Sequence, residues 1–294
     1  MHKKNRNSQG FSLIEVAVVI VIIGILIAGI ALSSNLIAKS RLQMALTLSK
    51  SSPIVGITQN VLWLETSLSE SIKDTEASDN APITAWSDQN NSGNRVSVVA
   101  VGSGPVYANT INRVHAVKFA GSTANYLQIA DASFLNNTDY TIVVLEKRMS
   151  NSSNNYFIGE NPSGTANQAL ALGYSADASV IHSQGSGTSY NSAVSTYDTS
   201  TDKARFFVFT HSATDGNKTY VNGLLASQDA TKTAHLSGLS TLAIGKAYTG
   251  EIGEVVVFTK ALLNSERVAV EDYLSKKWSR DNLRKTTSDG KCIS

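Results

Sequence analysis

The most informative part of the sequence is Gly10-Phe11-Ser12-Leu13-Ile14-Glu15, with the apolar run that continues to Leu32, because it indicates how the whole chain is organised. A short leader with three basic residues and no acidic one precedes it. From Phe11 to Leu32, about 22 residues, the only polar side chains are those of Ser12 and Glu15. As a helix rising about 1.5 Å per residue, this run spans roughly 33 Å, enough to cross a bilayer. A carboxylate within such a segment costs several kcal/mol unless it is paired, so Glu15 indicates a specific contact.

These residues resemble the prepilin leader, or class III signal sequence, of type IV pilins and type II secretion pseudopilins. The resemblance rests on the basic leader, the glycine at its end, the Phe-Ser-Leu-Ile-Glu that follows and the long Val/Ile/Leu run. In that family a prepilin peptidase cuts after the glycine and methylates the new N-terminal phenylalanine. The resemblance implies cleavage between Gly10 and Phe11 and N-methylation of Phe11. It also implies that Glu15 pairs with the N-terminal amine of a neighbouring subunit during assembly.

An ordinary signal peptide is the alternative interpretation of this stretch. Its apolar core has only about 7–15 residues and ends at a small-residue cleavage site. The run found here is longer, and Glu15 does not belong in such a core. Lys3, Lys4 and Arg6 lie just before the run and favour a cytoplasmic N-terminus. We therefore expect a single-pass inner-membrane protein that later enters a pilus or pseudopilus, with its head in the periplasm or at the cell surface.

Helical periodicity continues beyond the apolar run. Between Ser33 and Ser51 apolar residues recur every three or four positions, and Pro53 then ends the helix. No proline lies near Leu32, where many pilins have one, so a kink is not expected there. The predicted organisation is a leader peptide at 1–10, a transmembrane and assembly helix at 11–53, a β-sandwich head at 54–280 and a polar tail at 281–294.

Short apolar segments alternate with turn residues from Val61 to about Lys260. Asn222-Gly223, between two such segments, predicts a type I′ hairpin turn. Many strands at regular spacing, with almost no internal helix, predict a two-sheet sandwich or jelly roll. The predicted strands are 61–65, 96–101, 114–120, 126–130, 140–148, 156–159, 169–174, 179–183, 193–197, 204–212, 218–221, 224–227, 241–245 and 252–259.

Five stretches in this region resemble the concanavalin A-like, laminin-G-like jelly-roll superfamily. They are VLWLE at 61–65, ITAWSDQ at 83–89, VHAVKFAG at 114–121, YVNG at 220–223 and GEIGEV at 250–255. The resemblance implies an all-β sandwich that is followed by a C-terminal helix. The alternatives are an unrelated β-sandwich and the smaller antiparallel sheet typical of pilin heads.

A final helix is predicted after the last strand. Asn264 or Ser265 can cap it, and Glu266 suits its first turn. We expect its apolar face to pack on the sandwich. The residues of this face are Leu263, Val270, Leu274 and Trp278.

No catalytic residue is assigned, and the chain is not expected to be an enzyme. Glucanases of this superfamily carry paired carboxylates on one face of a strand, and retaining glycosidases need them about 5–5.5 Å apart. The nearest candidates, Glu251 and Glu254, are three positions apart, so on a regular strand they point to opposite faces.

No cofactor is expected. The five histidines are scattered at positions 2, 115, 182, 211 and 235, so the sequence predicts no metal cluster. Calcium is the ion to consider, because Asp88, Asn90, Asn91 and Asp131 occupy predicted turns of the kind that bind it in the superfamily that the head resembles. Asp and Asn also favour turns for conformational reasons alone, so no ligands are assigned.

Cysteine content and charge exclude two further features. The only cysteine, Cys292, rules out the internal disulfide that many type IV pilins have, and a free thiol is favoured over a bond between chains. The leader contributes three of the 25 Lys+Arg and none of the 23 Asp+Glu, so the mature chain carries 22 − 23 = −1. No nucleic-acid partner is expected from such a balance.

A carbohydrate site would need aromatic side chains at the surface, and the sequence names no ligand. Any glycan site therefore follows from the fold alone, which is weak evidence for function. The three tryptophans fall on positions predicted to lie in the core: Trp63, Trp86 and Trp278. The exposed candidates are Tyr107, Tyr190 and Tyr248.

These patterns together predict a pilin-like filament subunit, a minor pilin that displays a lectin-like head for adhesion or surface interaction. Its expected partners are other pilin subunits, the prepilin peptidase, the inner membrane and a glycan or protein ligand. A pseudopilin of a type II secretion system is the first alternative, since leader and helix are common to both. A membrane-tethered glycan-active enzyme is the second.

Overall fold

The computed structural model of the chain describes residues 12–91, 93–152, 154–159, 165–176, 179–185, 191–193 and 200–278. Contacts divide the chain into two compact units, Met1–Gln43 and Met44–Ser294. The predicted processing positions Gly10 and Phe11 lie outside the described residues, as does Cys292. The domain boundaries predicted at 10, 53 and 280 stay predictions.

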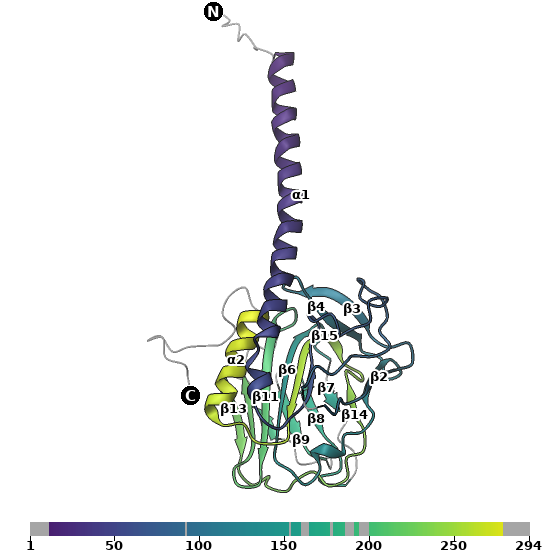
Figure 1. Cartoon of the computed structure of the whole chain (residues 1–294), viewed down its shortest axis with the longest axis vertical. Helices are drawn as coiled ribbons and strands as arrows, with labels where there is room; N and C mark the ends of the chain where they lie inside the picture. Colours follow the sequence, from purple (N-terminus) through teal and green to yellow (C-terminus); the bar gives the residue numbers. More distant parts are fainter. Residues whose placement is uncertain are drawn as a thin grey trace, which may run out of the picture. The chain divides into compact units, whose positions relative to one another are not determined.

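Helix α1 (Leu13–Lys50) passes the position of Leu32 without a break (Figure 1). Ser12 begins it, because its Oγ accepts a hydrogen bond of 3.3 Å from the backbone N–H of Ile14. Glu15 reaches back, and its Oε2 accepts a hydrogen bond of 2.7 Å from the backbone N–H of Ser12. This reciprocal arrangement is a capping box, so Glu15 has a local role in starting the helix.

The N-terminal half of α1 exposes its large apolar side chains in the single chain. Within the ranges described above, no helix combines the length and the apolar character that a membrane crossing requires. Contiguous apolar surface of this extent indicates a contact with another molecule. The exposed residues are Leu13, Ile14, Val16, Val18, Val19, Ile20, Val21, Ile22, Ile23, Ile25, Leu26 and Ile27.

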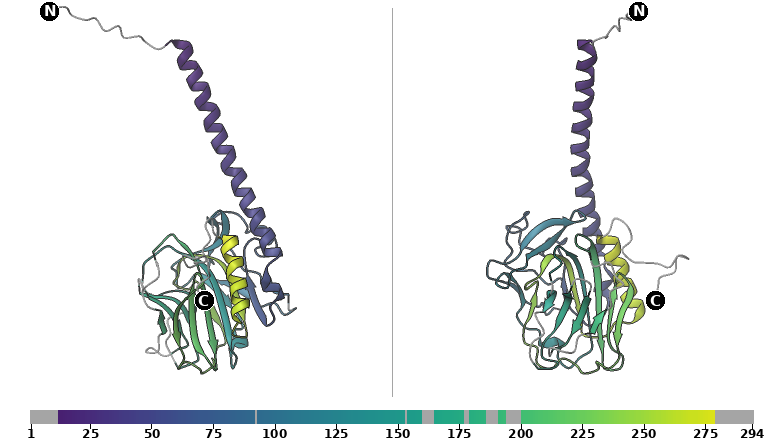
Figure 2. Two further views of the ribbon diagram at one scale, coloured as in Figure 1. Left: turned by 90° about the vertical axis from the view of Figure 1, so that its left-hand side faces the viewer. Right: turned by 180° about the vertical axis from the view of Figure 1, so that it is seen from behind.

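The second unit is an antiparallel β-sandwich, so the predicted fold class is confirmed (Figures 1 and 2). In the larger, eight-stranded sheet the order is β13 (Leu224–Asp229), β12 (Gly216–Val221), β11 (Ala204–Ser212), β6 (Tyr140–Arg148), β15 (Thr249–Phe258), β4 (Val114–Ala120) and β3 (Val106–Ile111), and β1 (Asn60–Leu64) also pairs with β15. In the smaller, seven-stranded sheet the order is β10 (Asn191–Ala193), β9 (Ser179–Ser183), β8 (Ala171–Ala176), β7 (Asn155–Gly159), β14 (Leu242–Ile244), β5 (Tyr126–Ile129) and β2 (Val98–Val101).

The central strands are apolar on both faces because each face is covered. In β6, Ile142 and Val144 belong to the core between the two sheets, whereas Val143 and Leu145 belong to a second apolar cluster. That second cluster includes residues of α2 (Asn264–Trp278), which lies along the outside of the larger sheet (Figure 2). A strand covered on both sides has a continuous apolar sequence, which explains the unbroken run in β6.

Most predicted strands exist, and four have the predicted bounds: β4, β6, β9 and β11. The hairpin turn at Asn222-Gly223 is confirmed, with φ values of 49° and 84°. Strand β3 was missed. Its hairpin with β4 turns at Asn112 and Arg113, whose φ values of 52° and 65° are left-handed. Arginine is not a turn-forming residue in that conformation, so the sequence gives no hairpin signal there.

The C-terminal helix is confirmed as α2, and three of the four residues predicted for its buried face are fully buried. These are Val270, Leu274 and Trp278. Leu263 is the exception, because it precedes the helix and is 67% exposed. Its backbone N–H donates a hydrogen bond of 3.0 Å to Glu266 Oε2.

A cluster of buried charges ties α2 to the rest of the second unit. The Lys277 ammonium donates hydrogen bonds to Glu65 at 2.8 Å and to Glu254 at 3.0 Å, and all three side chains are inaccessible to solvent. Ser49, in the last turn of α1, donates to Glu65 at 3.0 Å. Tyr273 donates to Glu254 at 2.8 Å. The cluster therefore joins segments from both ends of this unit.

The electrostatics of the cluster show why all its members must be present together. Burial on its own would raise the pKa of Glu65, but the charge and hydrogen bond of Lys277 outweigh it and lower the pKa to about 2. Burial would likewise lower the pKa of Lys277, but Glu254 and Glu65 outweigh it and raise the pKa. Removing the lysine alone would leave two buried carboxylates facing each other without a cation.

We expect Lys277→Met to lower the free energy of unfolding by about 3–5 kcal/mol, because it leaves two buried carboxylates without a cation. The neighbouring Lys276 is exposed, so Lys276→Met is a matched control that should change stability by no more than about 0.5 kcal/mol. Urea unfolding followed by tryptophan fluorescence measures both. Equal stability of the two variants would contradict the structural role of the cluster.

Candidate functional site: a histidine-lined pocket

The aromatic residues considered as carbohydrate platforms are buried wherever the structure describes them. The three tryptophans lie in the core, as predicted. The prediction for Tyr107 and Tyr248 is wrong, since they are only 5% and 0% exposed. Tyr248 contacts Phe119 and Phe157 in the core between the sheets and donates a hydrogen bond to Glu146. Tyr190 lies outside the described residues.

The two carboxylates considered as a catalytic pair are also buried. Strand β15 has a β-bulge between Ile252 and Glu254, so Glu251 faces Lys147 and Glu254 faces Leu145 across the sheet. The expectation that Glu251 and Glu254 point to opposite faces is therefore wrong, because the bulge adds a residue and restores the same face. Glu254 is bonded to Lys277, and Glu251 lies 3.7 Å from the ammonium of Lys147.

The two carboxylates named as calcium candidates, those of Asp88 and Asp131, have structural partners. Asp88 accepts hydrogen bonds from the backbone N–H groups of Trp63, Asn90 and Val96, at 2.9–3.0 Å. Burial nevertheless raises its pKa. Asp131 accepts a bond of 2.9 Å from the N–H of Ser133, the first residue of the short helix η2 (Ser133–Leu135). Both carboxylates therefore shape turns.

A pocket of about 230 Å³ lies between β9, β12 and the segment that follows β13. Amide, hydroxyl and imidazole groups line it, together with Lys232. Such groups both donate and accept hydrogen bonds, as hydroxyl-rich ligands require. Its polar side chains are those of Asn167, His182, Gln184, Asn217, Thr231 and Thr233.

His182 forms the inner wall of this pocket. Its Nε2 lies 2.7 Å from the hydroxyl of Tyr140, and its Nδ1 is buried with no hydrogen-bond partner among the described residues. Burial lowers the pKa of His182 to about 3, so the ring is neutral at physiological pH. The ring of Tyr140 stacks on that of His211, with their centroids 5.2 Å apart, so Tyr140 connects His182 in the pocket to His211 beside it.

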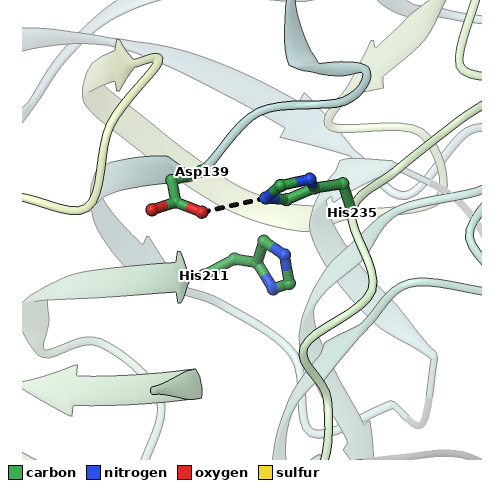
Figure 3. A group of neighbouring side chains, drawn as sticks. All are labelled: Asp139, His211 and His235. Atoms are coloured by element: carbon green, nitrogen blue, oxygen red, sulfur yellow. Dashed lines mark hydrogen bonds and ion pairs between the residues drawn. The ribbon is translucent and has the colours of Figure 1, made fainter. Parts of the chain in front are cut away.

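A second group of side chains adjoins the pocket: Asp139, His211 and His235 (Figure 3). One donor atom from each lies within 4.8 Å of the other two. Asp139 Oδ1 is 2.9 Å from His235 Nε2, and His211 Nδ1 is 2.7 Å from Asn217 Oδ1. Hydrogen bonds from His235 and from the N–H of Ala213 lower the pKa of Asp139 against the opposing effect of burial.

The fold assembles this group from positions that are distant in sequence. Asp139 directly precedes β6, and the antiparallel register of β6 and β11 sets His211 opposite Tyr140. His235 precedes Leu236, which forms an isolated bridge with Asn136. The expectation that the histidines are too scattered to form a cluster is therefore wrong. The group lacks a local motif, so it could be found only from the pairing of β6 with β11 and from the bridge that brings the segment of His235 to Asp139.

Two family profiles match the chain. The prokaryotic N-terminal methylation motif matches residues 5–31, and the concanavalin A-like lectin/glucanases superfamily matches residues 121–268. The chain thus joins a prepilin methylation motif to a lectin-like β-sandwich, as the sequence patterns predicted. No protein with a curated description matches it.

Several solved structures share the fold. Domain 4 of AbnA, a GH43 extracellular arabinanase from Geobacillus stearothermophilus in complex with arabinotriose, has 14% identity and a TM-score of 0.51, over 73% of this chain and 98% of that one. Trypanosoma rangeli sialidase in complex with sialic acid has 19% identity and a TM-score of 0.51, over 77% of this chain but 35% of that one. The binding domain of Paraclostridial Mosquitocidal Protein 1 has 12% identity and a TM-score of 0.51, over 73% and 52%. At these identities the likeness establishes the fold.

The buried neutral His182 makes stability depend on pH. In the unfolded chain its pKa is near 6.5, but in the fold it is about 3, so between these values only the unfolded state binds the proton. We expect the free energy of unfolding to fall below pH 6.5 by up to about 1.4 kcal/mol per pH unit from this residue. His182→Gln should show a shallower fall than the wild type in urea unfolding between pH 7 and 5. Parallel curves would contradict it.

Proposed function

The chain belongs to the concanavalin A-like lectin/glucanases superfamily, and we propose that it is a type IV pilin-like filament subunit whose β-sandwich head binds carbohydrate. The observation that carries this proposal is the union of two parts in one chain: the N-terminal methylation motif at 5–31 and the lectin-like sandwich. The first part would direct export and assembly into the filament, and the sandwich would be the part that binds a ligand. A prepilin peptidase cuts after Gly10 and methylates Phe11, and the subunit passes from the inner membrane into the filament.

The surface of α1 supports assembly through that helix. Its exposed apolar side chains from Leu13 to Ile27 would pack against the same helix of other subunits, or against lipid before assembly. Glu15 is the one carboxylate in this surface. In a neighbouring subunit the amine of the processed Phe11 would supply its charged partner.

The polar pocket supports carbohydrate binding. Sugars present many hydroxyl groups, and the pocket offers amide and hydroxyl groups that match them in both hydrogen-bonding senses. Gln184 contributes its side-chain amide to the lining of this pocket and is 7% exposed. Binding rather than hydrolysis is proposed because Glu251 and Glu254 are both buried. The subunit would act as a minor pilin in adhesion.

The assembly role can be separated from the capping role of Glu15. Glu15→Gln keeps the capping box but loses the charge, whereas Glu15→Val loses both. If the charge pairs with a neighbouring subunit, both variants should be processed to N-methylated Phe11 yet enter filaments at least about tenfold less than the wild type. Mass spectrometry of the mature N-terminus and immunoblots of sheared filaments measure the two steps. Normal assembly of Glu15→Gln would show that the capping box alone matters.

The carbohydrate site can be located with a pair of glutamine variants. The purified chain is applied to a glycan array that includes arabino-oligosaccharides and sialylated glycans. Gln184→Ala should weaken binding of the best ligand by about tenfold. Gln128 lines a different hollow of about 290 Å³ over β5 and β14, so Gln128→Ala is the matched control and should bind normally. The absence of glycan binding would contradict the proposed function of the head, and the reverse pattern would move the site to β5 and β14.

A further inference from the structure

We propose that Asp139, His211 and His235 bind one divalent transition-metal ion, with Zn²⁺ as the representative case. Three donor atoms, one from each residue, already lie within 4.8 Å of one another (Figure 3). In the figure the Asp139 carboxylate and the two imidazole rings converge on one another from three different segments of the chain. Zn²⁺ forms bonds of about 2.0–2.2 Å with imidazole nitrogen and carboxylate oxygen, which place tetrahedral donors about 3.3–3.6 Å apart. The donors of Asp139 and His235, now 2.9 Å apart, would separate slightly, and the most distant donors would move together.

The backbone holds all three residues in place. Asp139 and His211 are set by the register of β6 and β11, in which His211 pairs with Tyr140. The segment that carries His235 is fastened to the segment before β6, since the N–H of Asn137 donates a bond of 2.7 Å to the carbonyl of Leu236. Asn136 adds two side-chain bonds to the backbone of Leu239, at 2.8 and 3.0 Å. Because these contacts are built from backbone pairing, the site does not depend on mobile side chains alone.

The hydrogen bonds prepare His211 to act as a ligand. The Oδ1 of Asn217 can only accept, so the Nδ1 of His211 carries the proton and donates to it at 2.7 Å. The other ring nitrogen, Nε2, then keeps its lone pair. It is buried and has no hydrogen-bond partner among the residues that the structure describes. A hydrogen bond that fixes the tautomer and orientation of a histidine is the usual second contact of a metal ligand.

An ion pair without metal explains only part of the group. Such a pair accounts for the 2.9 Å contact between His235 and Asp139, and the N–H of Ala213 donates a further hydrogen bond to the same carboxylate. It leaves the buried lone pair of His211 without a partner among the described residues, which is unfavourable. A metal ion satisfies that nitrogen and both other donors at once. This unpaired nitrogen is the observation that favours a metal.

The donor set selects the class of metal. Two imidazole nitrogens and one carboxylate suit Zn²⁺ and similar ions, whereas Ca²⁺ and Mg²⁺ prefer oxygen ligands throughout. Three protein ligands leave at least one coordination position for water or for another ligand. Asn217, which holds His211, also lines the polar pocket, so the ion would lie beside that pocket.

Metal binding is tested on the full chain, purified without a polyhistidine tag and stripped with EDTA. Every sample carries His2→Ala and Cys292→Ser, because both residues could bind zinc elsewhere. We expect calorimetric titration to show one Zn²⁺ per chain at micromolar affinity or tighter, and Co²⁺ to give a visible absorption band at the same stoichiometry. An excess of Ca²⁺ or Mg²⁺ should displace neither ion.

Three variants decide whether the proposed residues are the ligands. His235 is about one-third exposed, so His235→Ala should fold normally and should lower Zn²⁺ affinity by about 100-fold or more. Asn217→Ala should lower it by about 10–100-fold through the orientation of His211. His115 stacks on Tyr107 away from the group, so His115→Ala is the control and should bind as the parent does. Absence of saturable binding by the parent, or unchanged binding by His235→Ala, would overturn the proposal.

Discussion

The bonds of Lys277 to Glu65 and Glu254 are the interaction on which the rest of the second unit depends. One ammonium is the shared cationic partner of two buried carboxylates. Through these carboxylates it connects α2 to β15 and to Glu65, which directly follows β1, and the last turn of α1 joins through Ser49. Trp63 and Trp278 add hydrogen bonds of 2.7 and 2.8 Å to Glu254, so apolar packing and charge pairing hold the same elements. The glycine at 253 belongs to this arrangement, because a Cβ there would lie 2.6 Å from the ring of Trp278.

Much of this fold could be predicted because its signals are local. Apolar strands, the Asn222-Gly223 turn and the face of α2 all follow from neighbouring residues, and the structure has them. The failures occur where conformation contradicts residue preference or where a regular element is interrupted. Arg113 adopts a left-handed φ of 65°, which hides the β3–β4 hairpin. The bulge in β15 reverses the faces expected for Glu251 and Glu254, since a strict alternation of two no longer holds.

The candidate site was less accessible to prediction, because it depends on sheet register. Asp139, His211 and His235 are separated by 72 and 24 positions, and each has an unremarkable local sequence. They meet only because β6 pairs with β11 and because Leu236 bridges to Asn136. The tyrosines show the opposite error. Tyr107 and Tyr248 are predicted to be exposed, yet both rings lie in the core between the sheets and their hydroxyls donate hydrogen bonds to internal acceptors.

The long reach of the Lys277 cluster has a consequence for the order in which the chain becomes a folded head. Glu65 and Lys277 are 212 positions apart, and Ser49 and Tyr273 are 224 apart. Because synthesis begins at the N-terminus, Glu65 is made long before Lys277, so the carboxylate that follows β1 has no cationic partner from Lys277 until the final helix has formed. Such long-range closure slows folding and leaves apolar strand faces uncovered during synthesis. Docking of α2 is therefore the step that completes the head. A chain that ends before Lys277 would stay incompletely folded and would be recognised by the proteases and chaperones of its compartment.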